Sequence, residues 1–336
     1  MRLEDVAEVA GVSAKTVSNV IRNYRYVSDA TRTKVEAAMA ELGYRVNLSA
    51  RALASNQTGF IALAIPGLDN PYYSRLAGYV IDAAREHDWI VLIEQTGSSE
   101  ALEKAAVSGA GSQLVDGVIL QPDAIGHADL TGRFAHHNLV LIGESGVTAS
   151  ADHVTADAAA AARELVEHLL AQGRSRIATV GIRPQDRPNA SELRYRGLSQ
   201  AVESAGLQVR AEYLIPVSRN RRPDGAEAVD QLLALDEPPD AIICFNDLVG
   251  SGVLARLRER GVRVPGDIAV AGFDDNEESR FTYPPLTSVA FDLEAIARRC
   301  VQRLLLRAGP DGADQPPVRT VVGHRLVVRG STVASD

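Results

Sequence analysis

The chain has 336 residues, which is more than one typical hydrophobic core, so the length predicts two or three domains. Apolar residues make up 46% of the sequence and the formal net charge is −8, which excludes a protein that is basic throughout. Residues 1–51 contain eight Lys/Arg and six Asp/Glu, so they carry +2 and the remainder carries −10. Any contact with nucleic acid is therefore expected in the N-terminal piece.

The cysteines and the lengths of the apolar runs indicate the expected compartment. Cys244 and Cys300 lie in apolar runs, which predicts buried free thiols and fits a reducing compartment. No signal-peptide pattern occurs at the N-terminus, and no apolar run approaches about 18 residues. We therefore expect a soluble, cytoplasmic protein with no membrane partner.

The first 42 residues predict three short helices. Apolar residues recur at helical spacing from Leu3 to Ala10, Gly11 follows as a helix end, and Ser13 offers an N-cap oxygen for the next helix. A third helix is expected from about Asp29 to Leu42. The residues predicted to be buried are Val17, Val20, Ile21, Val35, Ala38 and Met39, with Val9 and Val12 sharing the same small core.

The second of these helices has a polar outer face. Lys15, Ser18, Asn19 and Arg22 point away from its apolar residues, with Thr16 at the edge. Two short helices at a tight turn, the second with hydrogen-bonding side chains outside, are typical of a DNA-binding helix-turn-helix. The alternative interpretation is a three-helix unit that only caps a larger domain.

From Phe60 onward, short apolar strands alternate with amphipathic helices. This alternation predicts a parallel sheet covered by helices on both faces. The alternation starts again near Val154 and runs to the last strands within residues 318–329, so the sequence predicts two similar α/β halves. In such bilobed bodies, ligands bind at the carboxyl ends of the strands, in the crevice between the lobes.

Segments along nearly the whole chain resemble one known family. Three N-terminal segments resemble, in order and spacing, the DNA-binding headpiece and hinge of the lactose-repressor/galactose-repressor (LacI/GalR) family of bacterial transcription factors: DVAEVAGVSAKTVSNVI, YVSDATRTKVEAAMAELGY and NLSARAL. Later segments resemble the family's effector domain, which is like a periplasmic sugar-binding protein: IALAIPGLDNPYYSRLAGYV, FNDLVGSGVLARLRERGVRVPGDIAVAGFDD and GHRLVVRGST.

This resemblance implies an all-α helix-turn-helix headpiece followed by an α/β bilobed, periplasmic-binding-protein-like domain with two parallel sheets. We expect the headpiece at 1–46, a hinge helix and linker at 47–58, and the effector-binding and dimerisation domain at 59–336. The N-lobe is expected at about 59–150 and 288–318, and the C-lobe at about 151–285 and 319–336, with crossings near 145–153, 283–288 and 317–321. The hinge is too short to hold a helix alone, so we expect it to fold with DNA and a second copy present.

The resemblance assigns DNA contacts to the second helix and to the hinge. In the major groove, Lys15 can donate to guanine, Asn19 can pair with adenine, and the Ala14 methyl can touch a thymine methyl. Leu53 matches the family's leucine wedge, which opens a base step in the minor groove, and Arg51 is expected along the same groove. The residues expected on phosphates are Thr16, Ser18, Arg22, Asn23 and Arg25, although a solvated surface is the alternative for the two arginines. Ala54 stands where the family often has a basic residue.

Polar and aromatic residues at the predicted strand ends indicate an effector site. Asp274 and Asn246 each end a strand, and Arg194 lies near the start of a helix. A carboxylate, an amide and a guanidinium suit a polyhydroxylated ligand, because each can hold hydroxyl groups in pairs. The remaining candidates, which match effector-contact positions of the family, are Tyr72, Tyr73, Glu144, Asp157 and Phe273. For Asp247 and Asp275, helix N-capping is the favoured interpretation.

These features together predict a transcription repressor that binds a palindromic operator in double-stranded DNA as a homodimer. The expected effector is a sugar or sugar derivative; a nucleoside or purine, or a partner protein, is the alternative. A free sugar-binding protein is disfavoured because the headpiece would then have no purpose. An enzyme is disfavoured because no GxSxG, HExxH, GxGxxG or P-loop pattern occurs, so no catalytic residue, cofactor or metal is expected. No leucine-heptad tail follows Arg329, which favours a dimer over a tetramer.

Overall fold

The structure of the protein is a computed structural model that divides the chain into two compact units, Met1–Thr58 and Gly59–Asp336. The residues that it describes are 2–21, 24, 26–44, 57–110, 114–126, 129–130, 138–144, 151–185, 189–309, 312 and 315–333. The predicted hinge helix at 47–54 lies outside the described residues.

The first unit contains the three predicted helices, which are α1 (Leu3–Ala10), α2 (Ala14–Ile21) and α3 (Asp29–Glu41). Gly11 ends α1 in the left-handed conformation at φ 63°, and the Ser13 hydroxyl accepts the Thr16 N–H at 3.1 Å, as predicted. The buried core consists of Val6, Ala7, Val17, Val20, Val35 and Ala38. The prediction was wrong for Val9, which is 47% exposed because it lies off the face of α1 that turns toward this core.

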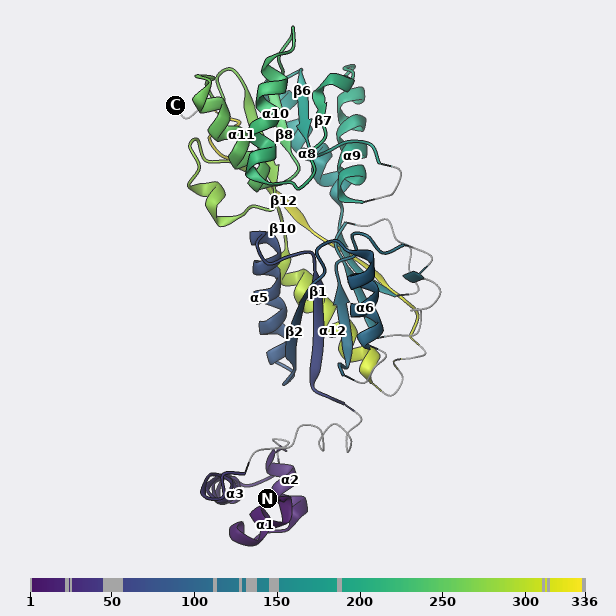
Figure 1. The fold of residues 1–336 in the computed structure, drawn as a ribbon, viewed down its shortest axis with the longest axis vertical. Helices are drawn as coiled ribbons and strands as arrows, with labels where there is room; N and C mark the ends of the chain where they lie inside the picture. The colour runs from purple at the N-terminus through teal and green to yellow at the C-terminus, as the bar shows by residue number, and fades with distance from the viewer. Residues whose placement is uncertain are drawn as a thin grey trace. The chain divides into compact units, whose positions relative to one another are not determined.

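The second unit begins with the N-lobe, whose sheet has the strand order β11-β5-β4-β3-β1-β2 with every pair parallel. Its strands are β1 (Phe60–Ile65), β2 (Ile90–Gln95), β3 (Gly117–Leu120), β4 (Leu139–Ile142), β5 (Asp152–Ala156) and β11 (Arg319–Val322). Its helices are α5 (Pro71–Arg85), α6 (Glu100–Ala110) and α12 (Leu293–Ala308). Helices α5 and α12 share one buried cluster with the sheet and α6 shares another, so both faces are covered (Figure 1).

The C-lobe sheet has the order β12-β10-β9-β8-β6-β7, and only β12 is antiparallel to its neighbour. Its strands are β6 (Ile177–Val180), β7 (Leu214–Ile215), β8 (Ala241–Cys244), β9 (Ala269–Phe273), β10 (Thr287–Phe291) and β12 (His324–Val327). Its helices are α8 (Ala158–Ala171), α9 (Ala190–Ser204), α10 (Arg222–Leu233) and α11 (Asp247–Glu259), with short 3-10 turns at Ala211–Tyr213 and Glu277–Arg280. None of the helices within the described ranges is long and apolar enough to cross a membrane.

Three single residues carry the chain between the lobes. Asp157 separates β5 from α8, Asp292 separates β10 from α12, and Gly323 separates β11 from β12. Each crossing therefore falls a few residues later than the ranges expected from the sequence, because each strand first completes the sheet of the lobe that it leaves. Both aspartates also cap the helix that follows, accepting the N–H of Ala160 and of Ala295 at 2.9 Å.

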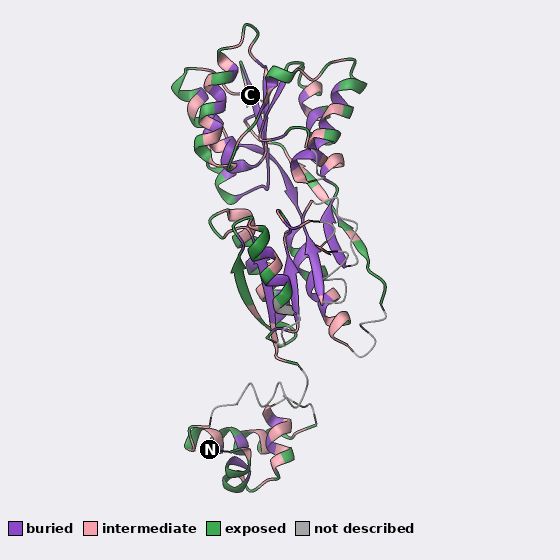
Figure 2. Ribbon diagram, turned by 45° about the vertical axis from the view of Figure 1, so that its right-hand side comes forward, coloured by how far each residue is buried: buried purple, intermediate pink, exposed green. Residues whose placement is uncertain are grey.

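Glycines set the helix spacing in the C-lobe. A Cβ built on Gly197 of α9 would lie 2.0 Å from the Ala159 carbonyl oxygen of α8, and one on Gly252 of α11 would lie 1.9 Å from the Arg222 carbonyl oxygen of α10. Real atoms do not approach so closely, so only glycine lets the two helices of each pair meet at these points. The close contacts therefore lie between α8 and α9 and between α10 and α11. Figure 2 shows these helices with their buried residues in purple on both sides of the C-lobe sheet.

Gly197→Ala should therefore destabilise the protein by about 1–3 kcal/mol, the usual cost of forcing extra atoms into a close-packed contact. Gly78→Ala on α5 is the matched control, since nothing lies within 4 Å of its Cβ position and alanine favours the helix by up to about 1 kcal/mol. Urea unfolding followed by circular dichroism measures both. Equal midpoints for the two variants would contradict the close contact between α8 and α9.

Candidate functional site

The two lobes meet through side chains that follow the carboxyl ends of their strands. Glu144 lies just after β4 in the N-lobe, and Arg194 lies in the first turns of α9 in the C-lobe. The Arg194 Nε and Nη2 donate to the two carboxylate oxygens of Glu144, both at 2.9 Å. The Arg194 and Glu144 side chains are only 6% and 8% exposed, so this is a buried, bidentate ion pair between the lobes.

Aromatic rings surround this guanidinium. Its central carbon lies 4.2 Å from the ring centre of Phe273, 4.8 Å from that of Phe245 and 5.8 Å from that of Phe291. Its Nη1 donates to the Phe245 carbonyl oxygen. Rings that face a cation stabilise it where water is excluded, so Arg194 is held by aromatic faces as well as by Glu144.

Tyr72 and Tyr73, at the start of α5, add two more rings to the cluster. Their ring centres are 5.1 Å apart in an edge-to-face arrangement. Burial raises the pKa of both phenols, and the negative charges of Glu144 and Asp123 add to the effect at Tyr72 and Tyr73 respectively. Both hydroxyls therefore stay protonated and can donate a hydrogen bond to a ligand.

Asp274 follows β9 in a strained turn. Asp274 and Asp275 have φ values of 103° and 46°, and non-glycine residues adopt this region only where their surroundings hold them. Arg75 of the N-lobe donates from Nη1 to the Asp275 carbonyl oxygen at 2.8 Å and to the Asp274 carbonyl oxygen at 3.5 Å. Burial, followed by the charge of Asp247, raises the pKa of Asp274 well above its usual value, although Arg194 opposes this.

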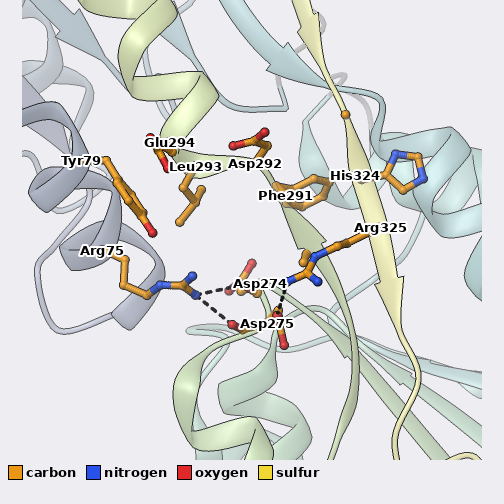
Figure 3. A pocket seen from close by; sticks show the side chains of 12 residues that line it. Arg75, Tyr79, Asp274, Asp275, Phe291, Asp292, Leu293, Glu294, His324 and Arg325 are labelled. Atoms are coloured by element: carbon orange, nitrogen blue, oxygen red, sulfur yellow. Dashed lines mark hydrogen bonds and ion pairs between the residues drawn. The ribbon is translucent and has the colours of Figure 1, made fainter. Parts of the chain in front are cut away.

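A pocket of about 360 Å³ lies beside this turn at the junction of the lobes (Figure 3). Figure 3 shows Arg75 and Arg325 pointing toward the turn from opposite sides, with Leu293 and Phe291 above the two arginines in this view. The pocket shares Asp274 and Phe291 with the buried cluster. The Asp274–Asp275 turn therefore borders open space on one side and the cluster on the other.

The N-capping interpretation of Asp247 and Asp275 was wrong. Asn246 occupies the N-cap of α11, where its side chain accepts the Val249 N–H at 2.9 Å, so Asp247 is free for another role. The Asp247 carboxylate accepts from the Asn276 N–H and from the hydroxyls of Ser279 and Ser288, at 2.8, 2.6 and 2.6 Å. Asp275 instead binds Arg329 at 2.5 Å and Arg325 at 3.6 Å.

The structure brings most of the predicted effector residues together. Six of the eight candidates lie in the cluster around the buried ion pair, which also includes Phe245 and Phe291: Tyr72, Tyr73, Glu144, Arg194, Phe273 and Asp274. Two candidates have their side chains engaged elsewhere: Asp157 is exposed and caps α8, and the amide of Asn246 caps α11 and donates to the Asn220 carbonyl oxygen at 3.3 Å.

Sequence reasoning missed other residues of the site. Phe245 and Phe291 follow β8 and end β10, as Phe273 ends β9, so their position at a strand end was a usable signal. Asp69 and Arg221 form an ion pair of 2.5 Å across the two lobes, but 152 positions separate them and no local pattern links them.

In the first unit, α2 carries five of the predicted DNA-contacting residues. Lys15 is exposed, whereas Ala14, Thr16, Ser18 and Asn19 are half-buried. The Thr16 hydroxyl is 2.9 Å from that of Ser13, so capping engages it already. The predicted contacts Arg22, Asn23, Arg25, Arg51 and Leu53 lie outside the described residues. Two exposed rings, Tyr24 and Tyr26, lie 5.5 Å apart after α2 and were not singled out from the sequence.

Asp247 makes the stability of the protein depend on pH. Burial outweighs its three hydrogen bonds and raises the pKa of Asp247 to about 6. Between about pH 4 and pH 6 the folded state therefore binds a proton that the unfolded state has released, so the free energy of unfolding falls as pH rises through this range.

Asp247→Asn cannot titrate, so the stability of the natural protein relative to this variant should fall by about 3 kcal/mol between pH 4 and pH 7. Urea unfolding at a series of pH values measures this difference. Asp267→Asn, at an exposed carboxylate paired with Arg263, is the control and should lack a decline across pH 4–7. A constant difference for Asp247→Asn would show that this carboxyl stays ionised throughout.

Each of the two units resembles a known protein family. Residues 2–47 match the family model described as bacterial regulatory proteins, lacI family, and residues 166–332 match that of a periplasmic binding protein-like domain. The HTH-type transcriptional regulator DegA of Bacillus subtilis is 32% identical over 332 residues, which cover 98% of this chain and 97% of DegA.

Solved structures are similar over the same length. The lac repressor dimer bound to operator and the anti-inducer ONPF has a TM-score of 0.82 and 30% identity, and the match covers 99% of each chain. The complex of the transcriptional regulator CelR with cellobiose has a TM-score of 0.71 and 30% identity, covering 98% of this chain and 99% of CelR. The helix-turn-helix unit, the two-lobed α/β unit and these whole-length similarities show that the chain belongs to the LacI family of DNA-binding transcriptional regulators.

Proposed function

We propose that this regulator is a repressor that binds a near-palindromic operator as a homodimer and responds to a neutral, polyhydroxylated effector, a sugar or sugar derivative, held between its lobes. The observation that carries the effector assignment is the buried cluster of one guanidinium and two carboxyl groups among aromatic rings. Aromatic rings cover the apolar faces of a sugar, while carboxylates and guanidinium groups bind its hydroxyls in pairs.

The charges of the cluster favour a neutral ligand over an anion. Inside the cluster, the charge of Arg194 is already balanced by Glu144, through two hydrogen bonds of 2.9 Å. An anionic ligand such as a sugar phosphate could pair with Arg194 only by displacing the Glu144 carboxylate, which would then be left as a buried charge without its partner. The similarity to CelR, solved with cellobiose, supports the carbohydrate class.

The polar face of α2 supports operator reading. Asn19 and Lys15 are four residues apart, so they lie on one face of the helix and can reach neighbouring base edges. Charge alone is a weak source of affinity, because residues 1–51 carry only +2. We infer that two headpieces act together, with Leu53 of each hinge opening the central base step and Arg51 beside it.

Two exposed apolar surfaces of the second unit are candidates for contact with a second copy of the chain. Strand β2 lies at the edge of the N-lobe sheet and is largely exposed (Figure 2). Its exposed apolar residues are Ile90, Leu92 and Ile93. In the C-lobe, Phe281 and Tyr283 are 79% and 80% exposed. Exposed apolar residues on an edge strand invite association, so we assign these two surfaces to the homodimer contact. The similarity to the lac repressor dimer supports this assignment.

Asn19→Ala and Lys15→Ala should each weaken operator binding by about 1–3 kcal/mol and relax base preference at one position of each half-site, because each removes one base contact. Selection of binding sites from random duplexes, followed by titrations, measures both effects. Lys34→Ala on α3 removes the same charge outside α2 and should leave the preferred sequence unchanged. Equal weakening of binding to every DNA sequence would show that Lys15 and Asn19 contact only phosphates and not bases.

A thermal-shift screen against neutral sugars, sugar phosphates and nucleosides tests the effector class. A neutral sugar should raise the melting temperature and change operator affinity, and Asp274→Asn should remove both responses by weakening the hydroxyl contact. Asp157→Asn makes the same chemical change outside the cluster, retains a good N-cap, and should leave the responses intact. Stabilisation by nucleosides or sugar phosphates alone would overturn the assignment to neutral sugars.

A further inference from the structure

Three contacts made by the chain's own residues join the two lobes. Glu144 pairs with Arg194 inside the site, Arg75 donates to the backbone of the Asp274–Asp275 turn, and Asp69 pairs with Arg221 at the surface. Each contact has one partner in each lobe, and none requires a ligand to form. The two lobes can therefore be held together by hydrogen bonds and ion pairs between their own residues.

We propose that the pairs Glu144–Arg194 and Asp69–Arg221 form an interlobe lock, which holds the lobes closed by itself, so that an effector has to replace Glu144 at Arg194 in order to bind. The part that concerns the effector rests on the function proposed above. The closing of the lobes by these residues does not, because it concerns the protein alone.

The inner pair is the stronger part of the interlobe lock. Glu144 and Arg194 share two hydrogen bonds of 2.9 Å, and aromatic rings exclude water from the guanidinium. Separating a buried pair without rehydrating it leaves two unpaired charges, which is strongly unfavourable. Only an opening wide enough to let water reach both groups, or a ligand that replaces one of them, removes this penalty.

The outer pair adds a weaker, salt-sensitive contact. Asp69 lies in the loop between β1 and α5, and Arg221 occupies the N-cap of α10; their side chains are 65% and 39% exposed. Exposed pairs contribute little individually, so this pair adjusts the closed population and does not set it alone. The N–H of Arg221 also donates to Asp224 at 2.8 Å, which fixes the backbone that carries the guanidinium.

A two-state element follows from this arrangement. Closed lobes satisfy Glu144 and Arg194 with each other, and open lobes satisfy both with water, whereas intermediate separations satisfy neither. An effector with hydroxyl groups can take over the donors of Arg194 while its own hydroxyls donate to the Glu144 carboxylate. Effector binding would then exchange one set of closed contacts for another, and the headpieces would respond to the difference in lobe geometry.

The test measures the distance between the lobes in the intact protein with no small molecule added. Spin labels are placed on Ala101→Cys in α6 and Glu227→Cys in α10, which are both exposed. The natural Cys244 and Cys300 are fully buried and do not take the label. Labelled subunits are diluted with unlabelled ones, so that double electron–electron resonance reports distances within one chain.

The natural sequence should give one short distance. Glu144→Gln keeps the shape of the side chain but removes its charge, and should raise the ratio of long to short distances by about tenfold or more. Asp69→Arg should produce a smaller rise, and the exchanged pair Asp69→Arg with Arg221→Asp should restore the short distance. Arg219→Gln, which removes a neighbouring exposed charge, is the control and should change nothing.

An unchanged distance distribution in Glu144→Gln, or a failure of the exchanged pair to restore the distance that Asp69→Arg loses, would overturn the interlobe lock. Circular dichroism verifies that each variant is folded; if Glu144→Gln is not, the exchanged surface pair still decides. Because no effector is present, this result is independent of the screen for sugars. A confirmed interlobe lock with no sugar response would refute the proposed effector class alone.

Discussion

A guanidinium group that is removed from water must find partners inside the protein, and both lobes of the second unit provide them for Arg194. Glu144 comes from the other lobe, Phe245 at the end of β8 supplies its carbonyl oxygen and its ring, and two further strand ends supply the rings of Phe273 and Phe291. The penalty for an unpaired buried charge makes these contacts interdependent. A change at any one of these contacts therefore alters the surroundings of a charge that residues of both lobes hold.

The Asp274–Asp275 turn is likewise held in place by hydrogen bonds and ion pairs with residues outside it. Two consecutive residues with positive φ persist because Asp247, Arg329 and Arg75 hold the turn from three sides. The Asp247 carboxylate accepts the Asn276 N–H directly after the turn, the Asp275 carboxylate pairs with Arg329, and Arg75 reaches the turn from the N-lobe. The position of the Asp274 carboxyl group is therefore coupled to lobe closure through Arg75.

Local patterns predicted the elements well, because they depend on periodicity and caps that a short window contains. The helices of the headpiece and the strand–helix alternation from Phe60 are of this kind. The crossings were placed early, because an apolar strand such as β5 or β10 has the same pattern in either sheet and only pairing decides its lobe. Similarly, both Asn246 and Asp247 suit an N-cap, and only the fold shows which one caps. Asp69 and Arg221 had no local signal, since their pairing exists only between folded lobes.

The one-residue crossings have a mechanical consequence. Asp157, Asp292 and Gly323 leave very few backbone dihedral angles between the last residue of one lobe and the first of the other. Two of the three are fixed further, because the same aspartate caps the helix that begins the next lobe. Three short, roughly side-by-side tethers permit bending about the line that joins them but resist sliding and separation. The second unit is thus a single-axis joint, in which the angle between the lobes is the main variable.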